Sequence, residues 1–197
     1  VEDAMAVLTL NALFNSVIFA VSVTALQLVL TITTGFAIAK MPFPGRGLLL
    51  GVFVITLFVP FQVLLIPTFL IVRDLKWIDT WPGVILPVVA QTSFCVFVFR
   101  QFYIDLSDDL LDAARIDGAS WGQLFLTIVV PISGPAIAAY VSITVLTAWN
   151  MYIWPLVATT TIDLRVLPVA LSAMVTQRAQ ITPNVAMMGV LISTLPI

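Results

Sequence analysis

The chain has 197 residues and a formal net charge of −2, with 61% hydrophobic residues, only 9% charged residues and no histidine. Soluble domains carry about 25% charged residues, so this composition excludes an ordinary soluble fold and favours lipid around most side chains. The slight negative charge also excludes the basic surface that binds nucleic acid.

Five apolar stretches follow one another, at residues 11–39, 48–72, 83–99, 136–157 and 184–197. A helix needs about 20 residues to cross the hydrocarbon core. The first, second and fourth stretches are long enough, the third is at the short limit, and the fifth is too short. We therefore predict an all-α, polytopic membrane helical bundle of about five spans, forming a single transmembrane domain over residues 1–197.

Both ends of the sequence indicate a longer protein. Glu2 and Asp3 place acids where a signal peptide carries bases, and the fifth apolar stretch stops at Ile197 before it can cross a membrane. We expect the protein to begin before Val1 and to continue past Ile197.

The loops between the stretches are short. Residues 40–47 are rich in proline and glycine and predict a tight turn. Residues 73–82 place two tryptophans at interface positions, and residues 158–183 include a piece, 164–175, that predicts a short surface helix. The positive-inside rule does not orient the chain, because four bases fall on each side: Lys40, Arg46, Arg100 and Arg115 against Arg73, Lys76, Arg165 and Arg178.

Residues 100–135 hold half of the acidic residues but have the pattern of helices rather than of a flexible loop. Ser107 can cap a helix whose first turn contains Asp108 and Asp109, and Gly118 suits the position just beyond its end. The apolar and small residues between them predict one helix face that packs.

A second short helix follows the glycine. Ser120 and Gln123 have the spacing of a capping box, and apolar residues continue to Pro131. We predict two short helices joined by a sharp bend, a rigid elbow that can enter a partner's groove and transmit its motion. Asp117 is interpreted as a latch whose carboxylate accepts from the N–H groups of the second helix; the alternative is an exposed acid without a role.

Polar groups inside the apolar stretches are few. Gln62 lies between Pro60 and Pro67, two helix breaks that free backbone carbonyls, and irregular backbone at membrane depth usually lines a cavity. We therefore place residues 60–67 on a translocation path; the alternative is a packing kink. Asn150 and Tyr152 can bind a polar solute, or belong to an interfacial aromatic belt.

The chain has no ATPase motif. A P-loop requires Gly-Lys followed by Ser or Thr, whereas Lys40 and Lys76 follow Ala39 and Leu75. With no histidine and a lone cysteine, Cys95, which we interpret as a packed small hydrophobe, we predict neither catalytic residues nor a bound metal or cofactor.

One pattern resembles a known signature. Asp112-Ala113-Ala114, then Gly118, Ile128 and Val130-Pro131, has the spacing of the E-A-A-x3-G-x9-I-x-L-P motif of ABC importer permease subunits, with Asp for Glu and Val for Leu. The flanking residues resemble the carbohydrate-uptake branch, the maltose-transporter type, and glycerol-3-phosphate permeases resemble it too: Arg100-Gln101-Phe102, Arg115-Ile116-Asp117-Gly118-Ala119-Ser120 and Trp149-Asn150-x-Tyr152-x-Trp154-Pro155-Leu156.

The resemblance implies a multi-pass subunit of a bacterial-type inner membrane with six helices in the full chain. It implies a cytoplasmic coupling loop at residues 101–135, an extracytoplasmic loop at residues 158–183, and inward transport of a sugar or polyol by alternating access. The implied partners are a second permease subunit, two ATPase subunits that bind ATP and magnesium, and a solute-binding protein outside. The residues implied to couple to the ATPase are Asp112, Ala113, Ala114, Arg115, Asp117 and Gly118.

Two other function classes compete with this interpretation. A secondary carrier or channel predicts charged residues inside the spans and internal repeats, and the apolar stretches contain no acid or base. A membrane scaffold would use the elbow to dock another protein without transport.

Overall fold

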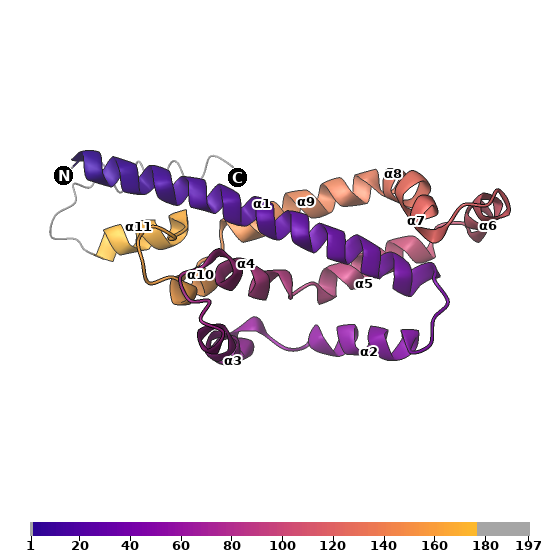
Figure 1. The fold of residues 1–197 in the computed structure, drawn as a ribbon, viewed down its shortest axis with the longest axis horizontal. Coiled ribbons are helices and arrows are strands. Elements are labelled where there is room, and N and C mark those ends of the chain that lie inside the picture. Colours follow the sequence, from indigo (N-terminus) through magenta and orange to yellow (C-terminus); the bar gives the residue numbers. More distant parts are fainter. Residues whose placement is uncertain (1, 177–197) are drawn as a thin grey trace. The chain divides into compact units, whose positions relative to one another are not determined.

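The computed structural model describes residues 2–176, with side chains over residues 10–173 (Figure 1). All regular elements among these residues are helices, which confirms the predicted all-α class. The fifth apolar stretch, residues 184–197, and the end of the loop at residues 158–183 lie outside the described residues.

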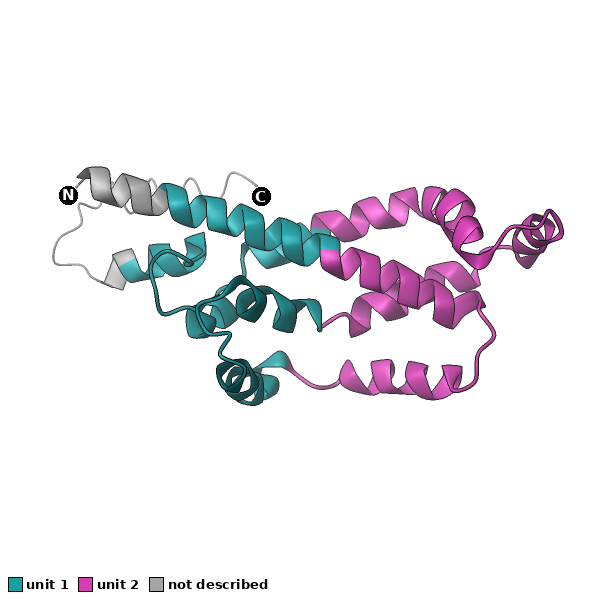
Figure 2. Ribbon diagram, in the orientation of Figure 1, with its two compact units in different colours: residues 1–25, 61–90, 143–197 teal, residues 26–60, 91–142 magenta. Residues whose placement is uncertain are grey.

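Contacts divide the chain into two compact units (Figure 2). Unit 1 contains Val1–Ala25, Phe61–Ala90 and Ile143–Ile197, and unit 2 contains Leu26–Pro60 and Gln91–Ser142. Each unit has its own buried cluster of apolar side chains. The assignment of a single domain to the whole chain stays a prediction.

The first predicted span is one long helix, α1 (Glu2–Lys40), which ends two residues before Pro42. Among the described residues, only its part Leu10–Lys40 is long and apolar enough to cross a membrane unaided. Up to four spans result if each of three bent helix pairs counts as one. The third of these pairs joins residues Trp121–Ile132 to Gly134–Trp149, so it begins before the fourth predicted span, residues 136–157.

Of the other three spans, the second was predicted to break at Pro60 and Pro67, while the third and fourth were predicted as continuous, and that continuity is wrong. A break of a few residues divides each into two helices, because polar residues or proline interrupt the apolar run and remove helix hydrogen bonds. The pairs are α2 (Arg46–Thr56) with α3 (Phe61–Asp74), α4 (Trp81–Val89) with α5 (Ser93–Ile104), and α9 (Gly134–Trp149) with α10 (Ile153–Ala158).

The break before α3 shows how the chain leaves the helix. The N–H groups of Leu57, Phe58 and Val59 donate to carbonyls three residues back, at 3.2, 3.1 and 3.3 Å, so the last turn tightens before Pro60. The second predicted break does not occur, since Pro67 lies inside α3.

Unit 1 packs around the fully buried Trp154 of α10, whose Nε1 donates to the Val84 carbonyl at 3.0 Å. The predicted helix at residues 164–175 is present as α11 (Leu167–Thr176). It is not a surface helix, because Leu167 and Val169 are buried in the unit's core. The Leu167 N–H donates to Ser16 Oγ of α1 at 2.7 Å, which caps α11 from a neighbouring helix.

Unit 2 packs around aromatic rings. Phe36 of α1 stands edge-on to Tyr103 of α5, with ring centroids 5.8 Å apart, and Phe99 lies beside Tyr103 at 5.9 Å. Since α5 extends to Ile104, Arg100 lies within the helix rather than at its end. The helix thus extends beyond the predicted apolar stretch, which ends at residue 99.

A tight loop joins α3 to α4. Lys76 and Asp79 have φ values of 60° and 57°, and the loop's carbonyl at Trp77 lies against the first turn of α4. A Cβ on Gly83 would overlap that carbonyl oxygen and lie 2.8 Å from its carbon. Only glycine fits there.

We expect Gly83→Ala to destabilise the protein by more than about 2 kcal/mol, because the added methyl group meets rigid backbone. Gly51→Ala is the matched control: nothing lies within 4 Å of its Cβ position, and alanine favours a helix by up to about 1 kcal/mol. The two variants should shift the thermal unfolding midpoint in detergent in opposite directions. Equal midpoints would contradict the close approach.

Candidate functional site

The predicted elbow is present in unit 2. Its first helix, α6 (Asp108–Ile116), begins after Ser107 and has Asp108 and Asp109 in its first turn. The Ser107 side chain makes no capping hydrogen bond, so this part of the prediction is wrong. The acids at the positive end of the helix dipole remain as the favourable feature of this terminus.

The bend lies at Gly118, whose φ of 87° is in the left-handed region. The Gly118 N–H donates to the Arg115 carbonyl and the Ala119 N–H to the Ala114 carbonyl, both at 3.0 Å. These two bonds form a Schellman motif, which closes the helix and turns the chain sharply. The predicted C′ glycine is therefore confirmed, with its physical cause.

The second half of the elbow starts with the predicted capping box. The Gln123 N–H donates to Ser120 Oγ at 3.3 Å, and the Ser120 N–H donates to Gln123 Oε1 at 2.9 Å. Three short helical pieces follow, α7 (Trp121–Leu124), the π-turn η1 (Phe125–Val129) and α8 (Val130–Ile132).

The interpretation of Asp117 as a latch is wrong. Its side chain is exposed and accepts no hydrogen bond from the described residues. The capping box provides acceptors for the Ser120 and Gln123 N–H groups at the start of the second helix, without Asp117. Backbone bonds fix the bend.

The elbow has one packed face and one free face. Leu111 is 4% exposed, and Ala114 packs against the same buried cluster as Phe36. On the other face Ile116 is 86% exposed, and Ala113 and Gly118 are exposed as well. A large apolar side chain among small ones at a protruding bend is suited to enter a groove of a partner protein.

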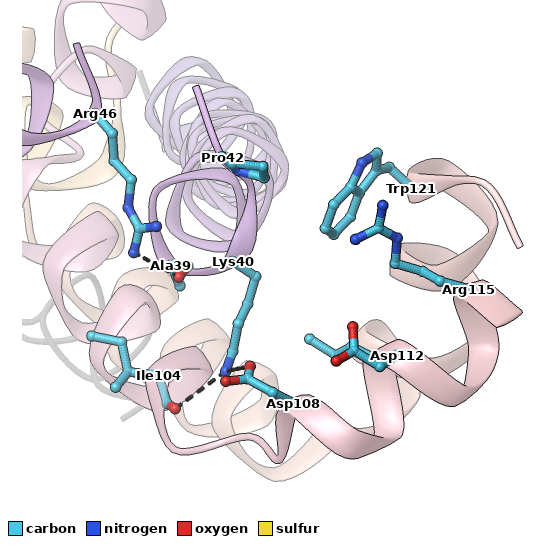
Figure 3. Close-up of a pocket in the computed structure, with 10 residues that line it drawn as sticks. Ala39, Lys40, Pro42, Arg46, Ile104, Asp108, Asp112, Arg115 and Trp121 are labelled. Carbon is cyan, nitrogen blue, oxygen red and sulfur yellow. Dashed lines mark hydrogen bonds and ion pairs between the residues drawn. The ribbon is translucent and has the colours of Figure 1, made fainter. Parts of the chain in front are cut away.

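A cavity of about 610 Å³ lies between the elbow and the end of α1 (Figure 3). The Arg115 guanidinium stacks on the Trp121 ring, 4.8 Å from its centroid, and both face the cavity together with Asp112. The remaining lining residues are Ala39, Lys40, Pro42, Arg46, Ile104, Asp108 and Leu111.

The cavity wall contains residues that sequence reasoning did not assign to the site. Lys40 was interpreted only as the edge of a turn, but its ammonium contacts Asp108 of α6. Trp121 was interpreted as part of a helix start, but it supports Arg115. Lys40 and Asp108 are 68 positions apart, so no local sequence pattern could predict their contact.

The predicted path residues fall mostly in unit 1. Helices α3 and α10 contact each other, with the Phe61 and Trp154 rings edge-to-face at 6.5 Å. Gln62 and Pro67 lie in α3, and Asn150 and Tyr152 lie just before α10, so this contact brings the two segments together. All four side chains are exposed. Pro60 ends the break before α3, in unit 2.

Asn150 has a structural role of its own. It follows α9, and its Nδ2 donates to the Leu146 carbonyl at 2.8 Å. The same carbonyl also accepts the Asn150 N–H at 3.1 Å, so the side chain adds a second bond in the last turn of the helix, where the predicted span breaks. Its Oδ1 accepts no hydrogen bond from the described residues.

A second cluster ties two loops of unit 1 together. The Asp79 carboxylate accepts from the N–H groups of Thr160 and Thr161, at 2.7 and 2.9 Å, and from both hydroxyls. Burial acts to raise the pKa of Asp79, but these hydrogen bonds outweigh it, so the pKa lies below its ordinary value. The contact places residues 73–82 beside the loop that starts at residue 158.

Because the folded state lowers this pKa, Asp79 stabilises the fold above its unfolded pKa and loses that effect as the pH falls through the folded value. We expect Asp79→Asn to cost about 1 kcal/mol at pH 7, and the difference from wild type to shrink progressively as the pH falls below about 4. Thermal unfolding against pH measures it. Asp74→Asn, which removes an exposed pair with Arg73, should have little effect; a pH-independent Asp79→Asn difference would contradict the assignment.

The bend could be held by the capping box or by the Asp117 carboxylate, and the two explanations predict different effects of mutation. Ser120→Ala removes the cap and should cost about 1 kcal/mol, so amides of residues 120–124 should exchange about fivefold faster with deuterium. Asp117→Ala should leave that exchange unchanged, because its carboxylate holds nothing. Fast exchange in Asp117→Ala would restore the latch.

Comparison with known proteins agrees with this geometry. Residues 27–197 match the family described as "Binding-protein-dependent transport system inner membrane component". The chain is 36% identical over 185 residues to the sn-glycerol-3-phosphate transport system permease protein UgpE of Escherichia coli strain K12 and to that of Shigella flexneri serotype 5b. These matches cover 93% of this chain and 66% of the relatives, so the chain spans just under two thirds of their length.

A solved structure shows the same fold. One chain of a bacterial ABC transporter involved in the import of the acidic polysaccharide alginate aligns with a TM-score of 0.81 at 24% identity, covering 94% of this chain and 64% of that chain. The family assignment also makes this a multi-pass protein of the inner membrane. The chain therefore belongs to the family of inner membrane components of binding-protein-dependent transport systems.

Proposed function

We propose that this chain is a transmembrane permease subunit of an ATP-binding-cassette importer that moves a sugar or a related polyol inward. The observation that carries the proposal is the elbow: in a member of a transport family, a rigid bend at Gly118 presents the exposed Ile116 outside the packed core. An element of this kind can receive a push from a partner and pass it on as a body.

The proposed partners follow from this division of labour. A second permease subunit completes the path, two ATPase subunits bind ATP and magnesium, and a solute-binding protein delivers cargo on the outer side. The residues proposed to meet the ATPase are those of the signature, from Asp112 to Gly118. The chain itself supplies no catalytic group.

Two loop contacts support the proposed sidedness. Lys40 joins the turn at residues 40–47 to the elbow segment, and Asp79 joins residues 73–82 to Thr160 and Thr161. The first pair is proposed as cytoplasmic and the second as extracytoplasmic. Each contact connects two loops that the proposed topology places on one side.

The solute class rests on the relatives. The curated relatives are named for sn-glycerol-3-phosphate transport, and the structural neighbour takes part in the import of alginate. Sugars, polyols and sugar phosphates share a row of hydroxyl groups, which amide and phenol side chains such as Gln62, Asn150 and Tyr152 can bind. A glycerol-3-phosphate importer is the second candidate, favoured by the 36% identity.

The proposed mechanism is alternating access. ATP binding closes the ATPase pair, the elbow carries that motion to the spans, and the path opens outward to accept solute. Hydrolysis returns it to the inward-facing state. The breaks near Pro60 and Asn150 provide the places where a span can change direction without losing whole helices.

The direct test is purification of the full chain in mild detergent with its ATPase partner, followed by ATPase measurement. Addition of solute-binding protein loaded with maltose or with sn-glycerol 3-phosphate should raise the rate for one of them. Absence of a co-purifying ATPase, or uptake that persists after ATP depletion, would contradict the importer and favour a scaffold or a secondary carrier.

Gly118→Pro should abolish uptake while leaving insertion and expression unchanged. Proline requires a φ near −65° and cannot adopt the observed 87°, so the bend is lost. Gly122→Ala is the control, because it lies in α7 with nothing within 4 Å of its Cβ position. Normal uptake by Gly118→Pro at normal expression would rule out the elbow as the coupling element.

A further inference from the structure

Lys40, the last residue of α1, contacts the segment that leads into the elbow (Figure 3). Its Nζ lies 2.6 Å from Asp108 Oδ1, 2.7 Å from the Leu106 carbonyl oxygen and 3.3 Å from the Ile104 carbonyl oxygen. An ammonium group has three donors. All three are directed to residues 104–108, which connect α5 to α6.

Three helix ends meet around the Lys40 ammonium, and the charge at each suits the helix dipole. Lys40 stands at the negative end of α1, Ile104 is the last residue of α5, and Asp108 opens α6. A cation favours helix C-termini and an acid favours a helix N-terminus, and the Ile104 carbonyl has no partner within its own helix. One ammonium at the end of α1 therefore bonds both the end of α5 and the first residue of α6.

The two members of the ion pair differ in exposure. The Lys40 side chain is 8% exposed, whereas that of Asp108 is 78% exposed. A buried ammonium depends on its acceptors, because leaving it unpaired is costly. Asp108 remains in water and can change its position. Lys40 is thus the fixed part of the contact, and the elbow end is the adjustable part.

This contact differs from the other links of α6. Leu111 packs against apolar neighbours, and apolar contact is non-directional and permits sliding. The hydrogen bonds from Lys40 set the distance between α1 and the elbow segment. The other ion pair among the described residues, Arg73–Asp74, joins chain neighbours and cannot link two helices.

We propose that Lys40 is a positioning residue that transfers motion of the elbow to α1. The inference rests on the proposed importer function and extends it to a residue outside the coupling signature. When the partner pushes α6, the Lys40 bonds keep residues 104–108 attached to α1. Without them the elbow moves against apolar contacts alone, and part of the motion is lost.

The test uses the complete transporter purified with its ATPase, assayed with binding protein carrying maltose or sn-glycerol 3-phosphate. Lys40→Met keeps the length of the side chain but removes all three hydrogen bonds. We expect the ratio of stimulated to basal ATPase rate to fall about 3- to 30-fold, the range typical of mutations along a coupling network. The yield of the complex and the half-saturating concentration of binding protein should stay unchanged. A variant that was merely misfolded would change one or both.

Variants of Asp108 supply the second readout. Asp108→Asn should lower the ratio of stimulated to basal ATPase rate less than Lys40→Met does, because the two bonds from Lys40 to carbonyl oxygens remain. Asp108→Glu keeps the carboxylate and should keep the wild-type ratio. The double variant Lys40→Met/Asp108→Asn should be no worse than Lys40→Met, since both changes remove one shared interaction. Asp105→Asn is the matched control: it neutralises an exposed carboxylate nearby that makes no ion pair.

The outcomes separate the two levels of the account. Normal stimulation in Lys40→Met, or additive losses in the double variant, overturns the role of Lys40 alone. A wild-type complex whose ATPase never responds to loaded binding protein overturns the importer and the role of Lys40 with it. If Lys40→Met does not assemble, the comparison of Asp108→Asn with Asp108→Glu decides, since the exposed Asp108 side chain can change without disturbing the core.

Discussion

Backbone polar groups that face lipid have no water to bind, and this constraint shapes the whole chain. Helices satisfy their own N–H and C=O groups, so any interruption must find other partners. Before Pro60 and after α9, N–H groups find carbonyls three residues back: Leu57, Phe58 and Val59 in the first case, Met151 in the second. At these two breaks the chain can leave the helix while its backbone N–H groups keep hydrogen-bond partners.

The elbow follows the same rule outside the spans. The Schellman bonds at Gly118 and the capping box of Ser120 and Gln123 satisfy the backbone at the bend. The bend thus needs no support from the charge of Asp117, which accepts no hydrogen bond from the described residues. At the opposite end of α6, Lys40 links the elbow to α1.

Local patterns in the sequence predicted the local parts of this structure. Glycine after the last turn and the Ser120–Gln123 spacing each depend on neighbouring residues, and both were predicted correctly. The break before α3 was predicted from Pro60, but those at residues 90–92 and 150–152 were missed, because apolar composition measures the length of a run and not its straightness. The Lys40–Asp108 pair and the Asp79 cluster join distant residues, and no spacing rule predicts such contacts.

If the tip of the elbow sits in a groove of an ATPase, as we propose, photo-crosslinking at the tip should capture that contact. A benzophenone amino acid at Ile116, which is 86% exposed, should give an adduct with the mass of this chain plus an ATPase subunit. The same group at Ile143, which is 66% exposed and lies in α9, should give none. An ATPase adduct from position 143 and none from position 116 would contradict the account.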